Sequence, residues 1–217
     1  MNKIKTDAAI QVVAANLFQK YGFEKTSMED IAREAHKSKR SIYNYFSNKE
    51  ELFMTLVSSE IDNIRHDLES LTEDESQHFL PRFRQYLLQR VQLFASAVNL
   101  RVAIRDRMFR ENNLRFRKLN QSKLQFIQWE RQFFKKVWES IKTDESPEIV
   151  DKQASAFADM LQVTLNGLSY TFFVEDKYDQ YKTSYRMLID LIINSISLVL
   201  STSKYPFSEF SLLQASN

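Results

Sequence analysis

Turn-forming residues are scarce in this chain, and this scarcity limits the folds open to it. The 217 residues include only two glycines and three prolines, and these are turn residues that hairpins and strand bends need. Apolar residues recur every three or four positions instead, which is the spacing of one face of a helix. The sequence therefore predicts an all-α protein.

The length and charge of the chain leave its organisation open. A chain of 217 residues suits either one core or a small domain packed on a larger one. The formal net charge is only +2, so any affinity for nucleic acid has to come from a local basic patch. Two apolar stretches imitate a targeting or membrane segment, but Gln11 with Asn16 and Asp190 with Asn194 interrupt them. We expect a soluble cytoplasmic protein without a membrane segment.

The sequence carries no set of residues typical of catalysis or of a bound cofactor. The chain has no cysteine, and its three histidines, His36, His66 and His78, lack the spacing of metal ligands. No Ser/His/Asp set, pair of carboxylates or glycine-rich phosphate loop stands out either. We therefore expect neither enzyme activity nor a cofactor or metal.

The first fifty residues predict several short helices. A first helix is expected from about Thr6 to Tyr21, ending at Gly22, because glycine suits the left-handed conformation that follows a helix. Side chains able to cap a helix N-terminus then follow at short intervals: Thr26 with Glu29 or, alternatively, Ser27 with Asp30, then Ser38, and then Ser47 with Glu50. Short helices with such connections pack at steep angles, as in a helix-turn-helix unit.

The third of these short helices is basic. Residues 35–49 hold four positive side chains and no negative one. Long cationic side chains in the first turn of a helix can reach guanine or phosphate, and small hydroxyl side chains let a helix approach DNA closely. The candidate DNA contacts are Thr26, Ser27, Ser38, Lys39, Arg40, Ser41, Tyr43, Tyr45 and Lys49. The alternative is that the basic stretch is only a solvated helix face.

Residues 18–35, FQKYGFEKTSMEDIAREA, and 38–52, SKRSIYNYFSNKEEL, resemble the TetR family of transcriptional regulators. The resemblance covers roughly residues 5–60. It implies a helix-turn-helix DNA-binding domain, residues 1–50, packed on a larger helical domain for effector binding and dimerisation, residues 51–217. The family usually has Gly-Val where this chain has His36 and Lys37; histidine tolerates a positive φ better than most residues.

The resemblance also implies a mode of action. A homodimer would bind a palindromic double-stranded operator with its two recognition helices about 34 Å apart. A small-molecule effector would shift the fourth helix and release the DNA, as expected of a repressor. For the dimer we predict that two long helices, about Pro147–Phe173 and Gln180–Thr202, pack against the same pair in a second copy. A shorter helix is expected around Val102–Asn112.

Aromatic residues on the long helices suggest where an effector could bind. They are candidates for the wall of an apolar or aromatic pocket, with one amide as a polar handle: Phe94, Phe109, Trp129, Phe133, Phe157, Asn166 and Tyr170. Ordinary core packing explains the same spacing. Gly167 inside a long helix suits either a close approach at a dimer seam or relief of crowding. The basic stretch 101–118 suits a solvated face, an acidic effector or a second DNA contact.

Two functions from different classes fit these observations. The first is a ligand-responsive, DNA-binding transcriptional regulator. The second is an interaction protein of the same shape that binds another protein through its long helices. The two differ in whether a specific palindrome is bound.

Overall fold

The structure, a computed structural model, describes residues 2–73, 79–109, 114–141 and 146–201. Every regular element in these ranges is helical, which confirms the all-α prediction. The elements are α1 (Asn2–Tyr21), α2 (Met28–Glu34), α3 (Lys39–Tyr43), α4 (Lys49–Glu73), α5 (Phe79–Ser96), α6 (Val98–Arg105), the 3-10 turn η1 (Leu114–Phe116), α7 (Arg117–Ile141), α8 (Pro147–Phe173) and α9 (Tyr178–Ser201). No described helix is long and apolar enough to cross a membrane.

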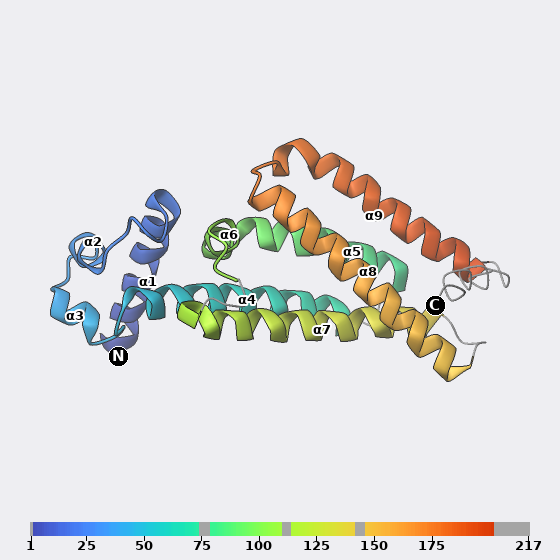
Figure 1. Cartoon of the computed structure of the whole chain (residues 1–217), viewed down its shortest axis with the longest axis horizontal. Helices are drawn as coiled ribbons and strands as arrows, with labels where there is room; N and C mark the ends of the chain where they lie inside the picture. The colour runs from blue at the N-terminus through green and yellow to red at the C-terminus, as the bar shows by residue number, and fades with distance from the viewer. Residues whose placement is uncertain (1, 74–78, 110–113, 142–145, 202–217) are drawn as a thin grey trace, which may run out of the picture.

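The three N-terminal helices lie at one end of the long axis of the molecule, and α4 leads from them into the larger bundle (Figure 1). α4 runs side by side with α7, and α7 packs along α8, while α9 packs on α5 and α8. The predicted boundary between residues 50 and 51 falls inside α4, which is one continuous helix. α4 is therefore shared by the N-terminal helices and the larger bundle.

The end of α1 follows the prediction made from Gly22. This glycine has a φ of +81°, and its backbone N–H donates to the carbonyl of Phe18 at 2.9 Å. The chain then folds back, so that the ring of Phe23 stacks on Phe18 with centroids 5.7 Å apart. Both rings are fully buried, which closes the core of the N-terminal helices.

The structure selects one of the two capping boxes expected before α2. The Ser27 hydroxyl accepts from the Asp30 backbone N–H at 3.1 Å, and an Asp30 oxygen accepts from the Ser27 backbone N–H at 3.1 Å. The box expected before α4 is displaced by one residue. Asn48 accepts from the backbone N–H of Glu51 at 2.7 Å, and Glu51 in turn accepts from the Ser47 backbone N–H at 2.7 Å. The predicted pairing of Ser47 with Glu50 is therefore wrong.

The turn between α2 and α3 is built without glycine. His36 has a φ of +51°. Its backbone N–H donates to Arg33 at 3.1 Å and that of Lys37 donates to Ala32 at 2.9 Å, which is the hydrogen-bond pattern of a Schellman motif. His36 thus takes the left-handed position usual for glycine, and α3 still starts at the expected place, after the N-cap Ser38.

An aromatic cluster joins the N-terminal helices to the bundle. The ring of Phe116 in η1 lies 5.3 Å from that of Phe23 and 6.3 Å from that of Phe53 on α4. Beside it, the Arg115 guanidinium donates to Glu50 at 2.6 Å and to Glu24 at 3.3 Å. The basic stretch 101–118 therefore contributes Arg115 and Phe116 to the contact between the N-terminal helices and the bundle.

Three predicted helices have bounds that differ from those observed, among them α1, which begins at Asn2 rather than at about Thr6. The short helix expected over Val102–Asn112 is α6, which begins earlier, at Val98, and ends at Arg105; Asn112 lies outside the described residues. α8 has the predicted bounds, and α9 begins at Tyr178 rather than Gln180. The predicted end of the last helix, Thr202, also lies outside the described residues.

Candidate DNA-binding surface and ligand cavity

The short helix α3 presents polar side chains to solvent. Ser38, Lys39, Arg40 and Tyr43 are exposed, whereas Ile42 is fully buried and anchors the helix to the core. Ser41 and Tyr45 are half-buried. Figure 1 shows α3 at the end of the molecule farthest from α9. The element therefore offers one polar face at the tip of the protein.

The two cations in the first turn of α3 differ in their surroundings. Lys39 forms an ion pair with Glu29 of α2, and the hydrogen bond between them raises the pKa of Lys39. The Lys39 side chain nevertheless remains 59% exposed. Arg40 makes no side-chain hydrogen bond or ion pair with any described part of the chain. Its guanidinium is thus a cation free to meet an external anion.

Two residues predicted to contact DNA are used within the protein instead. Thr26 is only 2% exposed, and its hydroxyl donates to the carbonyl of Gly22 at 2.9 Å. Lys49 donates from Nζ to the carbonyl of Phe23 at 2.8 Å and lies 4.4 Å from the centroid of the Phe23 ring. Burial lowers the pKa of its ammonium. The predicted DNA contacts by these two side chains do not fit this conformation, because both hold the N-terminal helices together.

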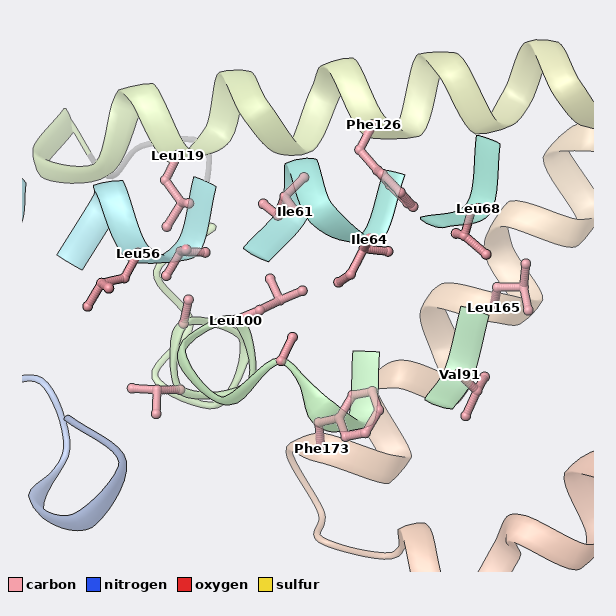
Figure 2. Close-up of a cluster of buried hydrophobic side chains, with 14 of the residues drawn as sticks. Leu56, Ile61, Ile64, Leu68, Val91, Leu100, Leu119, Phe126, Leu165 and Phe173 are labelled. Atoms are coloured by element: carbon pink, nitrogen blue, oxygen red, sulfur yellow. The ribbon is translucent and has the colours of Figure 1, made fainter. Parts of the chain in front are cut away.

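A cavity of about 260 Å³ lies between α4, α5, α6, α7 and α8. Four of the residues predicted to line a pocket do line it: Phe94, Phe109, Asn166 and Tyr170. Its other walls come largely from residues that the sequence did not single out, namely Ile61 and Ile64 of α4, Leu100 and Ile104 of α6, and Arg90 and Lys123. Figure 2 shows Ile61 and Ile64 between α7 and α6, with Leu100 facing them from α6.

Three predicted pocket residues do not line this cavity. Trp129 packs beside Phe126, with ring centroids 5.7 Å apart. Phe133 lies 4.6 Å from the ring of Tyr86, and Phe157 lies 5.0 Å from that of Trp138. Phe133 and Phe157 belong to the packing between helices, and Trp129 is partly buried against the core, which is the alternative that their spacing allowed.

Known proteins resemble the chain at its N-terminus and in its overall fold. Residues 10–56, which include α2, α3 and Arg40, match the family model of bacterial regulatory proteins, tetR family. This part of the chain is thus a TetR-family N-terminal domain. An uncharacterized HTH-type transcriptional regulator, YfiR of Bacillus subtilis (strain 168), is 33% identical over 75 residues, which are 35% of this chain and 37% of that protein. The chain thus matches well under half the length of that relative.

Solved structures of TetR-like regulators share the fold over nearly the whole chain. NalD, the secondary repressor of the MexAB-OprM multidrug efflux pump in Pseudomonas aeruginosa, has a TM-score of 0.63 at 21% identity, covering 88% of this chain and 97% of NalD. The fatty acid degradation regulator FadR from Bacillus halodurans has a TM-score of 0.63 at 15% identity, covering 92% of this chain and 97% of FadR. TetR-family regulators bind operator DNA and usually form dimers.

A buried ion pair lies beside the cavity. Arg90 of α5 donates to both carboxylate oxygens of Glu130 on α7, at 2.5 and 3.1 Å. Tyr86 and Gln162 also donate to this carboxylate, at 2.9 and 2.7 Å. Burial acts to lower the pKa of Arg90, but Glu130 outweighs it and the pKa is raised. The network joins α5, α7 and α8, and no sequence motif pointed to it.

The helix α6 links the cavity to the DNA-binding part of the TetR fold. Leu100 and Ile104 face the cavity from α6, and the same helix packs against α1. The N-cap residue of α6, Ala97, has no side chain able to cap it. The Glu60 carboxylate of α4 accepts from the backbone N–H groups of Asn99 and Leu100 instead, at 3.1 and 2.7 Å. α6, which lines the cavity, is therefore hydrogen-bonded directly to α4.

The last two helices carry apolar residues on exposed faces. Met160, Val163, Gly167 and Tyr170 fall on one face of α8, and Val163 is 73% exposed. On α9, Met187 and Leu191 are 63% and 64% exposed. A Cβ added to Gly167 would meet no atom within 4 Å, so this glycine does not relieve crowding within the described chain.

Proposed function

We propose that the protein is a homodimeric repressor that binds a palindromic operator through α3 and is released by a small apolar or aromatic effector. The observation that carries the proposal is Arg40, an exposed cation without a partner among the described residues, in the first turn of the helix that the family uses as a recognition helix. Residues 1–50 would form the DNA-binding domain and residues 51–217 the effector-binding and dimerisation domain, with α4 shared between them. Such a protein would act in the cytoplasm, without catalysing a reaction.

Base and phosphate contacts would come from the exposed end of α3. Arg40 suits a bidentate contact with guanine, and Lys39 suits a phosphate. The ion pair of Lys39 with Glu29 does not oppose this, because an exposed ion pair contributes only about 0–1 kcal/mol. Ser38, Ser41, Tyr43 and Tyr45 add hydroxyl groups on or beside α3, and Ser27 lies at the N-terminus of α2. A helix N-terminus favours phosphate.

Dimerisation would bury the exposed apolar faces of α8 and α9. Contiguous apolar surface of this kind is typical of protein interfaces. Gly167 supports a close approach of the partner helix, since there is open space where its side chain would lie. Two copies joined in this way would place their α3 helices side by side, about 34 Å apart when DNA is bound.

Release would start in the cavity and reach the DNA through α6 and α4. An effector that enlarges the space between α4, α6 and α7 has to displace Leu100 or Ile104. Glu60 then carries the shift of α6 to α4, which begins at the DNA-binding helices. A ligand that binds better to the shifted conformation moves the population towards it and lowers the affinity for DNA.

The exposed apolar faces of α8 and α9 also favour a second candidate, an interaction protein that covers them with a different protein. Selection of bound fragments from random DNA separates the two functions. The proposal predicts an enriched palindrome whose half-site centres are about one helical turn apart. Recovery of fragments without a shared motif would contradict it and favour the interaction protein.

A further inference from the structure

We infer that the cavity takes a monoanionic ligand with an apolar body, such as a small carboxylic acid, rather than a neutral apolar molecule. The inference rests on the proposed role of the cavity as the effector site. Its walls are mainly aliphatic and aromatic, and its charged lining residues are Arg90 and Lys123. None of the residues that line it is acidic. The charges of the lining residues therefore favour a ligand with a negative charge.

Arg90 does not need a charged ligand, because Glu130 already neutralises it. Arg90 is 1% exposed as a residue, and its guanidinium donates two hydrogen bonds to that carboxylate. It is also stacked 4.6 Å from the ring centroid of Phe94. The cavity therefore keeps one unbalanced positive charge, that of Lys123.

Lys123 has no counter-ion of its own in the described parts of the chain. Its ammonium lies 5.5 Å from the ring centroid of Phe109, and the side chain is half-buried at the cavity wall. Other lysines near carboxylates do pair with them, as Lys135 of the same helix does with Asp151 at 2.6 Å. A cation facing apolar walls gains most from an anion, because a charge-assisted hydrogen bond is about twice as strong as a neutral one.

A second group with unused hydrogen-bonding capacity lies at the same cavity. Arg90 Nη1 is buried and has no hydrogen-bond partner within the described parts of the chain. A buried donor left without an acceptor is costly, and a ligand that brings an acceptor removes this cost. Asn166 of α8 adds an amide to the lining. The oxygens of a carboxylate thus suit both the Lys123 ammonium and an N–H group of Arg90.

The volume of the cavity limits the size of the ligand. At about 260 Å³ it lies just below the range of roughly 300–1,000 Å³ typical of small-molecule pockets. A benzoic acid or a medium-length alkanoic acid is of the right scale. A ligand that also carries a nucleotide is too large for the cavity, unless the helices around it move apart.

Calorimetric titration with octanoate and octanamide tests the inference. The two ligands have the same apolar chain and number of heavy atoms and differ in charge. We expect octanoate to bind roughly tenfold more tightly, which corresponds to about one charge-assisted hydrogen bond. Lys123→Met should abolish this preference while octanamide binding stays unchanged. Lys136→Met, an exposed lysine on the same helix, should keep it.

Equal binding of the two ligands, the same preference in Lys123→Met, or no saturable binding of either at millimolar concentration would overturn the inference. DNA release is measured separately on the operator. Octanoate that binds through Lys123 and leaves the DNA affinity unchanged would support the anion site and contradict its role as the effector site. Release of DNA by a neutral ligand, without any preference for octanoate, would support the effector site and contradict the anion site.

Discussion

The carboxylate of Glu60 on α4 accepts a hydrogen bond from the backbone N–H of Leu100 at the start of α6, with 2.7 Å between Oε2 and N. Glu60 thus caps α6, which forms part of the cavity wall. Glu60 itself belongs to α4, the helix that begins at the DNA-binding unit. The interaction is short-ranged and directional, so α4 and the N-terminus of α6 have to move together.

Removing this cap should weaken both the fold and its response to ligand. We expect Glu60→Ala to lower the free energy of unfolding by about 1–2 kcal/mol, the usual cost of losing a helix cap. In urea denaturation, Asp62→Ala, an exposed acidic residue on the same helix, should change it little. Glu60→Ala should also reduce the effector-induced loss of DNA affinity. A full response in this variant would show that coupling takes another route.

The buried pair of Arg90 and Glu130 should be costly to break from one side. Arg90→Met or Glu130→Met alone leaves an unpaired charge in the core, and we expect each to cost about 3–5 kcal/mol of stability. The double variant should cost much less than the sum, because neither charge remains. A double-mutant cycle in urea measures this difference, and additive losses would argue against a coupled pair.

His36 should be a site of avoidable strain. Its φ of +51° is unfavourable for a residue with a side chain, so His36→Gly is expected to raise the free energy of unfolding by about 0.5–1 kcal/mol. His36→Val should lower it, because a branched side chain fits a positive φ poorly. Urea midpoints of the two variants test this. Equal midpoints would mean that the turn relaxes to another conformation.

The exposed face of α8 should hold the dimer together. We expect Val163→Asp to give a monomer in light scattering, because a buried carboxylate without a partner is strongly unfavourable in an interface. Val12→Asp places the same charge at another exposed valine, on α1, and should leave the dimer intact. A wild-type protein that is monomeric at micromolar concentration would remove the basis of this prediction.

Local signals in the sequence predicted much of the N-terminal fold. Gly22 marks the end of α1 and Ser38 the start of α3, because each acts on backbone within a few residues. The same logic missed the start of α4 by one residue, since Asn48 and Ser47 are both able to cap a helix. Caps are thus predictable to within about one position when capping residues are adjacent.

Long-range contacts could not be predicted in this way. Lys49 reaches the carbonyl of Phe23, 26 positions away, and nothing near Lys49 distinguishes this from a phosphate contact. The cavity shows the same limit. Phe94 and Phe157 look alike as apolar positions on long helices, yet only Phe94 lines the cavity. The crossing of the helices decides which face opens to it, and aliphatic lining such as Ile64 carries no signal of its own.

The affinity of Arg40→Ala for the selected operator tests the central claim most directly. By fluorescence anisotropy at fixed salt, we predict a loss of about 1–3 kcal/mol, or roughly 5–150-fold, on the operator. On scrambled DNA the loss should be much smaller, and Lys136→Ala, which removes an exposed positive charge on α7, should change neither. An Arg40→Ala protein that binds the operator as tightly as the wild type, or loses affinity equally on both DNAs, would contradict the assignment of α3 as the base-reading helix.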